Sequence, residues 1–143
     1  GYPADINLLQ GHKALRHASE ALEEGGVLLV AAECREGVGS DSYLDAFARG
    51  RHGVADGVRR RYTLNAQAAM STLDLTARHS IYLRSSLDDG LSSRFGFCAW
   101  KDDYTPFLLD GIPDEEILFL PHASRFLPRV SAKSGCASDG AIV

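Results

Sequence analysis

Gln10, Lys13 and His17 are the side chains whose types and spacing could hold a small anion. Steps of three and four residues place them along one stripe of a helix, away from its apolar stripe. In a parallel α/β domain the first turns of such a helix face the carboxyl edge of the sheet, where ligands bind. A carboxylate there would meet an ammonium, an amide donor and the positive helix end. The spacing is also typical of a solvated helix face, so both interpretations stay open at this point.

The loop over residues 33–40 is the second candidate for chemistry. Gly37 and Gly39 have the first spacing of a dinucleotide-binding fingerprint, but Ser42 stands where the third glycine is needed. A tight turn built from glycines that tolerate positive φ therefore fits this loop better. Glu36 could face the same crevice. A nucleotide-binding module remains an alternative that titration with NAD and ATP would test.

Motifs for hydrolysis and for metal binding are missing from the sequence. No serine stands in a GxSxG elbow, and no cysteine has a base nearby in sequence. Cys34, Cys98 and Cys136 are too widely spaced for a zinc site or a disulfide framework. We therefore expect no metal ligands in this chain, and a reducing, cytoplasmic setting. His122 follows an apolar run and could line a site at the end of a strand.

The composition is that of one ordinary globular domain. The chain has 143 residues, of which 45% are hydrophobic and 24% charged, so it can bury a core without staples. A formal net charge of −4 argues against nucleic-acid binding through bulk electrostatics. No apolar run is long enough for a membrane span, and no secretory signal pattern opens the chain.

Hydrophobic periodicity predicts alternating helices and strands. The expected helices are 5–24, 41–48, 63–76, 87–97 and 104–111, and the expected strands are 27–32, 81–83 and 117–120. Asp5 is the expected N-cap of the first helix, and Gly25-Gly26 its stop. The unbroken apolar run 27–32 is typical of a parallel strand covered on both faces. Together these elements predict a three-layer αβα domain with a mostly parallel sheet.

The order of the elements also bears on domain organisation. The chain opens on Gly1-Tyr2-Pro3 without a methionine and goes almost at once into a helix. The first helix of such folds normally follows a strand, so we expect the first strand to be missing upstream and the chain to be a fragment. Residues 1–130 form the expected domain. Residues 49–61 are expected to be a connector or an exposed helix, and residues 131–143 a loose tail.

Residues 1–14, GYPADINLLQGHKA, resemble the beginning of the C-terminal domain of the nickel-dependent lactate racemase family. There a GYP-type turn and an Asp precede a helix that carries Q-x-x-K. The similarity continues through residues 25–39 and more weakly into 117–124, so that it covers nearly all of residues 1–130. It implies an α/β domain that closes an active-site cleft with an N-terminal catalytic domain.

The resemblance also implies a reaction and its parts. In this family a nickel-pincer nucleotide is joined to a lysine of the N-terminal domain and ligated there by a histidine. The cofactor exchanges a hydride with the α-carbon of a 2-hydroxy acid, and two histidines of the same domain act as bases. The Q-x-x-K pair contacts the substrate and maps onto Gln10 and Lys13 of this chain. On the third helix, where the family carries a His or Trp, Gln67 is the nearby polar candidate.

Two departures from the family pattern matter. Leu9 stands where relatives of the founding racemase often have an aromatic residue, which puts the identity of the substrate in doubt. No residue matches the cofactor lysine or its histidine ligand. The resemblance therefore implies a substrate-binding domain of a 2-hydroxy-acid racemase or epimerase that is inactive without its own N-terminal domain. The alternative is a stand-alone α/β ligand-binding or interaction module without catalysis, and the reading frame upstream of Gly1 would distinguish the two.

Overall fold

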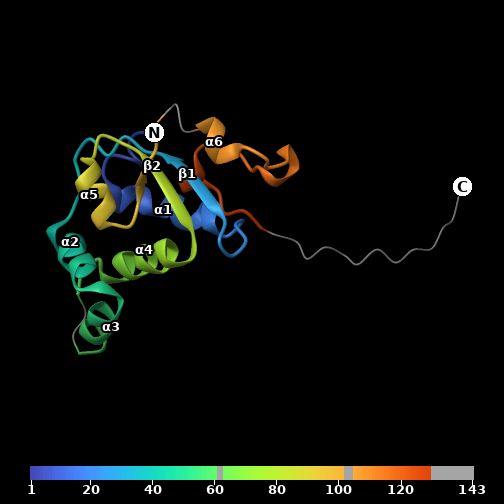
Figure 1. Cartoon of the computed structure of the whole chain (residues 1–143). Helices are drawn as coiled ribbons and strands as arrows, with labels where there is room; N and C mark the ends of the chain where they lie inside the picture. The colour runs from blue at the N-terminus through green and yellow to red at the C-terminus, as the bar shows by residue number, and fades with distance from the viewer. Residues whose placement is uncertain (61–62, 102–104, 130–143) are drawn as a thin grey trace, which may run out of the picture.

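A three-stranded parallel sheet forms the centre of the protein in a computed structural model that describes residues 1–60, 63–101 and 105–129 (Figure 1). Its strands are β1 (Val27–Ala31), β2 (Ser80–Arg84) and β3 (Cys98–Ala99), in the order β1-β2-β3. Both pairings are parallel, and Leu29 of β1 lies opposite Tyr82 of β2. The predicted α/β class with a parallel sheet is confirmed. The two-residue strand β3 was not predicted, and the helix expected over 87–97 is shorter, spanning Asp89–Arg94.

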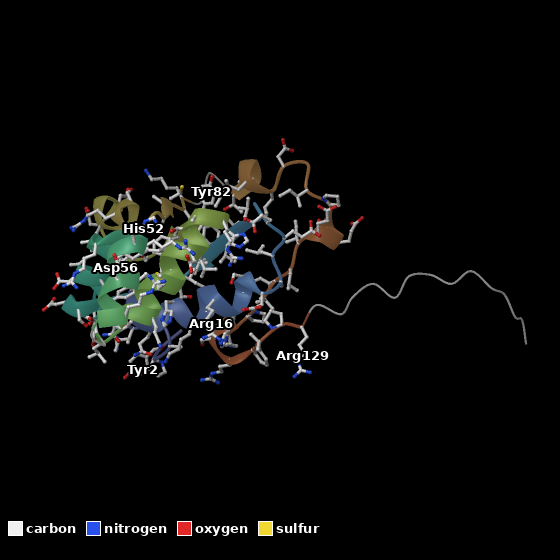
Figure 2. All side chains as sticks on the ribbon, turned by 90° about the horizontal axis from the view of Figure 1, so that it is seen from below. Tyr2, Arg16, His52, Asp56, Tyr82 and Arg129 are labelled. Carbon is white, nitrogen blue, oxygen red and sulfur yellow. The ribbon has the colours of Figure 1, made fainter. Side chains whose placement is uncertain are left out.

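The described part of the chain has six α-helices and two short 3-10 helices around this sheet. They are α1 (Leu8–Ser19), α2 (Asp41–Ala48), α3 (Gly50–Arg60), α4 (Ala66–Arg78), α5 (Asp89–Arg94), α6 (Thr105–Leu109), η2 (Asp114–Glu116) and η3 (Ala123–Arg125). Helices α2 and α3 pack on α4 at the end of the molecule away from α6 (Figure 1). His52 and Asp56 mark this end, and Arg129 lies at the other (Figure 2). No helix among the described residues is long and apolar enough to cross a membrane.

The core forms between the helices and one face of the sheet. Ile81 and Leu83 of β2 are buried in the same cluster as Leu15 of α1 and Leu75 of α4. Two aromatic rings extend this cluster toward α2 and α5, where Tyr43 stacks on Phe95 with ring centroids 5.5 Å apart. Burial of such aromatic and aliphatic side chains is the main source of stability in a domain of this size.

One buried polar contact lies within this core. The hydroxyl groups of Tyr43 and Thr72 are 2.8 Å apart, and both side chains are fully buried. Burial raises the pKa of Tyr43 to about 12. The contact ties α2 to α4 and keeps both hydroxyl groups hydrogen-bonded away from water.

Strand β1 is less enclosed than its unbroken apolar sequence predicts. Val27 is 39% exposed, Ala31 is exposed, and the three residues between them are half-buried. Alternation along the strand puts Leu28 and Val30 on the core face, whereas Val27 and Leu29 share the other face with Tyr82. Within the described residues β1 pairs only with β2, so it lies at an edge of the sheet.

The apolar run 117–120 does not form the predicted strand. Leu118 is 60% and Phe119 84% exposed, and the segment has no partner strand among the described residues. Its backbone is extended at Ile117 (φ −100°, ψ 117°), as its composition predicts. A strand needs a neighbour as well as β-forming side chains, and the sequence pattern contains no information on that neighbour.

The ends of several helices also differ from the prediction. Asn7, not Asp5, caps α1, and α1 ends at Ser19 rather than at the glycines. The Asp5 carboxylate instead accepts a hydrogen bond of 3.2 Å from the backbone N–H of Glu33. Ser40 caps α2 by accepting a hydrogen bond from the N–H of Tyr43, and residues 50–60 form the helix α3. The expected tail 131–143 lies outside the described residues.

Candidate functional site

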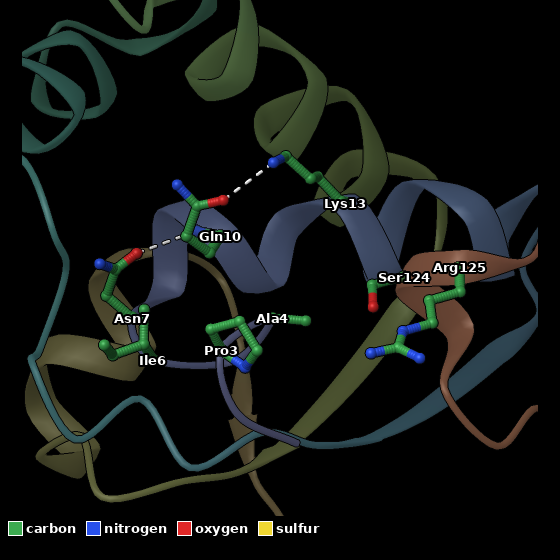
Figure 3. Close-up of a pocket in the computed structure, with 8 residues that line it drawn as sticks. All are labelled: Pro3, Ala4, Ile6, Asn7, Gln10, Lys13, Ser124 and Arg125. Atoms are coloured by element: carbon green, nitrogen blue, oxygen red, sulfur yellow. Dashed lines mark hydrogen bonds between the residues drawn. The ribbon is translucent and has the colours of Figure 1, made fainter.

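An open pocket of about 510 Å³ lies beside the first turns of α1 (Figure 3). Its walls come from the turn before α1, from α1 itself and from η3 near the other end of the described chain. The lining residues are Pro3, Ala4, Ile6, Asn7, Gln10, Lys13, Ser124 and Arg125. The fold thus brings together segments that are more than 100 residues apart in sequence.

Two of the predicted site residues meet in this pocket. The ammonium of Lys13 donates a hydrogen bond of 2.8 Å to the side-chain oxygen Oε1 of Gln10. Figure 3 shows the two side chains directed toward each other. As the helical stripe predicts, the spacing of three residues places both polar groups over one stretch of α1.

The backbone N–H groups of Leu8, Leu9 and Gln10 at the start of α1 are not available to a ligand in the pocket. This corrects the expectation that a carboxylate would meet the positive end of the helix. The N–H groups of Leu8 and Leu9 donate to the carbonyl oxygens of Gly37 and Val38, at 3.0 and 3.1 Å. The N–H of Gln10 donates to Oδ1 of Asn7 at 2.9 Å. Three of the four donors that a helix leaves unpaired are therefore engaged. These three N–H groups are therefore not available to a bound anion.

The loop 33–40 has a structural role at this same helix end. Gly37 and Gly39 have φ values of +70° and +84°, as expected for a turn built from glycines. A Cβ atom at Gly39 would lie 2.2 Å from Cγ of Asn7, so the loop packs directly against the helix cap. The loop presents carbonyl oxygens to α1, which is the reverse of what phosphate binding needs. This geometry supports the turn over the dinucleotide site.

His17, the third residue of the predicted stripe, does not line the pocket. It contacts η3, which forms one wall of the pocket. Its Nδ1 is 3.1 Å from the carbonyl oxygen of Ala123, the first residue of η3. The next two residues, Ser124 and Arg125, line the pocket. Ser124 and Arg125 were not predicted as site residues, because no local sequence pattern places residues 124–125 beside residue 10. The weak resemblance over 117–124 and the position of His122 after an apolar run were the signals in the sequence that pointed to this segment.

The other candidate residues lie elsewhere. Gln67 is exposed on α4, and His122 is exposed at the start of η3, and neither is among the lining residues. Glu36 is exposed in the loop and does not line the pocket either. Cys34 is buried, and burial together with the charge of Asp5 raises the pKa of its thiol to about 11. This thiol is therefore protonated at neutral pH, as in structural cysteines.

The charges around the pocket favour a negatively charged ligand. Lys13 and Arg125 both line it, and no Asp or Glu does. Within the part of the chain that the structure describes, neither cation makes an ion pair with a carboxylate. Two cations without counter-charges at the mouth of one pocket would attract an anion from solution.

The described residues do not fit a nickel site. Among residues 1–60, 63–101 and 105–129, no three His, Cys, Asp or Glu side chains come together as metal ligands. The donor set that a nickel centre would need is therefore not found in this part of the chain. The pocket residues can therefore bind and orient a ligand.

The chain is similar to known proteins in sequence and in fold. Residues 1–71 match the lactate racemase C-terminal domain family. The lactate racemase of Thermoanaerobacterium thermosaccharolyticum is 38% identical over 47 residues, which cover 33% of this chain and 11% of that protein. The solved apoprotein of a lactate racemase from that organism superposes with a TM-score of 0.64 and 23% identity, over 78% of this chain and 30% of that one.

These similarities cover different parts of the chain and have different weight. The structural superposition shows a shared fold across most of the described residues. The sequence match is confined to the front half, which contains β1, α1, the loop 33–40 and the pair Gln10 and Lys13. The chain spans less than a third of the solved relative. The similarity to the lactate racemase C-terminal domain family is thus a match over residues 1–71, just under half of the chain.

Proposed function

We propose that this chain is the substrate-binding C-terminal domain of a 2-hydroxy-acid racemase or epimerase. The observation that carries the proposal is the hydrogen-bonded pair of Gln10 and Lys13 in an open pocket, inside the segment that matches the family. A substrate of this class is small and carries one carboxylate beside a hydroxyl group. The pocket supplies the matching cation and amide.

The two side chains have different tasks in this proposal. The Lys13 ammonium neutralises the substrate carboxylate through a charge-assisted hydrogen bond. Because the Gln10 amide oxygen accepts from Lys13, the two N–H donors of the amide are available to the carboxylate or hydroxyl of the substrate. Together they would fix the α-carbon in one position, which is how substrate-positioning residues contribute to rate.

The remaining parts of the reaction belong to the rest of the protein. We propose that a nickel-pincer nucleotide on an N-terminal domain supplies hydride chemistry, that bases on that domain move the proton, and that this chain alone is inactive. Support comes from the match of residues 1–71 to the lactate racemase C-terminal domain family. The free thiols of Cys34 and Cys98 suit a reducing compartment, and we propose a cytoplasmic location.

The test is a pair of variants in the complete protein that contains this chain. Lys13→Ala should abolish interconversion of the two enantiomers of lactate while leaving the nickel content per protein unchanged. Arg16→Ala is the matched control, because Arg16 is an exposed cation on the same helix and does not line the pocket. Wild-type kinetics for Lys13→Ala would show that the site assignment is wrong.

A stand-alone binding module is the second candidate. It would need only the open pocket with Lys13 and Arg125 in its lining, which can bind an anion without any chemical step. Intact mass and nickel analysis of the protein purified from its natural source distinguish the two. A nickel-bearing species well above 15.5 kDa supports the domain of a racemase, and a metal-free species at 15.5 kDa supports the module.

A further inference from the structure

We infer that the pocket accepts 2-hydroxy acids that carry a second anionic group, and that Arg125 binds this group. The inference rests on the proposed function, since Lys13 and Gln10 are taken to hold the carboxylate and hydroxyl that all such substrates share. It goes beyond that function by assigning the far end of the ligand.

Arg125 is held at the pocket by backbone contacts rather than by its own side chain. Its N–H donates to the carbonyl oxygen of His122 at 2.8 Å within η3, and His17 holds Ala123 against α1. The guanidinium is exposed and points toward Ala4, whereas Lys13 points toward Gln10 (Figure 3). The two cations thus approach the pocket from different walls, one from α1 and one from η3.

A ligand with a single carboxylate would leave one of these cations without a partner. Among the described residues, neither Lys13 nor Arg125 has a carboxylate partner, and the lining contains no acid that could compensate either charge. Two like charges at one site repel each other, and a ligand with an anionic group at each end removes this repulsion. Charge complementarity therefore favours a dianion over a monoanion.

The size of the pocket and the side chains of its second wall are both consistent with a second anionic group on the ligand. The pocket is open, with a volume of about 510 Å³, so its walls do not enclose a ligand of six non-hydrogen atoms and leave room for a longer one. The planar guanidinium offers a fork of donors that matches a carboxylate or a phosphate, and the Ser124 hydroxyl on the same wall is a further donor. The second group can be either of these two anions.

Binding to the complete protein tests the inference, with three probes at one fixed ionic strength. Racemic lactate carries one anionic group, racemic malate adds a carboxylate, and 3-phosphoglycerate adds a phosphate. Isothermal titration is carried out with the wild type, with Lys13→Met, Arg125→Met and Arg125→Lys, and with Arg129→Met. Arg129 is the matched control because it is exposed in the same segment but does not line the pocket.

Malate or 3-phosphoglycerate should bind the wild type about tenfold more tightly than lactate, which corresponds to about 1.4 kcal/mol. Arg125→Met should remove this advantage, so that the three probes bind this variant with similar affinity. Arg125→Lys should keep part of it, because it keeps the charge and loses the fork. Lys13→Met should weaken all three probes, and Arg129→Met none. The probe that gains most identifies whether the second group is a carboxylate or a phosphate.

Other outcomes overturn the inference and are distinct from failure of the proposed function. If lactate binds in a way that depends on Lys13 but neither dianion gains from Arg125, the inference is wrong and the proposed function stands. If Arg125→Met weakens all three probes equally, Arg125 holds the shared carboxylate and the inference is again wrong. If no probe binds and Lys13→Met changes nothing, both are wrong.

Discussion

The imidazole Nδ1 of His17 lies 3.1 Å from the carbonyl oxygen of Ala123, a contact between residues 106 positions apart. It joins the outer side of α1 to η3, and η3 carries two of the residues that line the pocket. One side chain on the first helix thus contributes to holding η3 where its residues can line the pocket. The pocket depends on a tertiary contact outside its own lining.

Replacement of this histidine should loosen the second wall without unfolding the domain. In His17→Phe the contact to Ala123 is lost at a cost of about 1 kcal/mol, and the N–H of Arg125 should exchange with solvent faster. Amide hydrogen exchange measured by NMR reports this directly. His52→Phe is the control, because His52 is exposed on α3 at the far end of the molecule (Figure 2). Unchanged exchange at Arg125 in His17→Phe would show that other contacts hold η3.

Two glycines of one loop allow backbone strain to be separated from steric overlap. Gly37 and Gly39 both have positive φ, but only Gly39 faces a neighbour within 4 Å, namely the side chain of Asn7. Gly37→Ala should therefore cost about 1 kcal/mol of the free energy of unfolding, from backbone strain alone. Gly39→Ala should cost about 2 kcal/mol more, because it also displaces the side chain that caps α1. Urea denaturation of the two variants measures the difference, and equal costs would refute the packing of Asn7 on the loop.

Alkaline pH should destabilise the protein through Tyr43. Burial raises its pKa from the ordinary 10.0 to about 12, so the unfolded chain loses this proton first as the pH rises. The unfolded state then binds fewer protons than the folded state, and stability falls between about pH 10 and 12 by up to about 1.4 kcal/mol per pH unit.

Tyr43→Phe should show a shallower loss of unfolding free energy over this range. It also loses the contact to Thr72, so the slope with pH is the informative quantity rather than the stability at one pH. Tyr82→Phe, which changes a half-buried tyrosine on the sheet, serves as the control. Parallel slopes for wild type and Tyr43→Phe would mean that Tyr43 ionises as easily in the folded state as in the unfolded chain.

The exposed apolar run should govern how the isolated chain behaves in solution. Phe119 is 84% exposed beside Leu118, and apolar surface of this kind promotes association. Phe119→Ser should raise the concentration at which light scattering first detects oligomers. Leu64→Ser is the matched control, because Leu64 is 63% exposed but belongs to another part of the molecule. Equal effects of the two variants would show that the run is not the cause.

Local patterns in the sequence predicted what depends on neighbours along the chain. The apolar stripe of α1, the strand β1 and the cap of α2 at Ser40 follow from periodicity and from side chains a few residues apart. The contact between Gln10 and Lys13 follows from a helical spacing of three. Each of these features depends on a single segment of the chain, so the sequence of that segment is sufficient to predict it.

What the sequence did not predict depends on which segments meet. Asp5 and Asn7 are both suitable helix caps. The Asp5 carboxylate accepts a hydrogen bond from the N–H of Glu33 instead, and Asn7 caps the helix. The run 117–120 has the composition of a strand but no partner among the described residues. Arg125 enters the pocket because of a contact to the first helix. No local pattern contains these pairings.

The packing of Gly39 against Asn7 also constrains how this sequence can have changed in descent. A side chain at position 39 would meet one at position 7, so substitution of the glycine is tolerable only in a lineage that already has a smaller residue at position 7. Serine would satisfy this condition and still cap the helix. The order of the two replacements is therefore fixed, with position 7 first. In any set of descendants, the loss of Gly39 should be found only together with a change at Asn7.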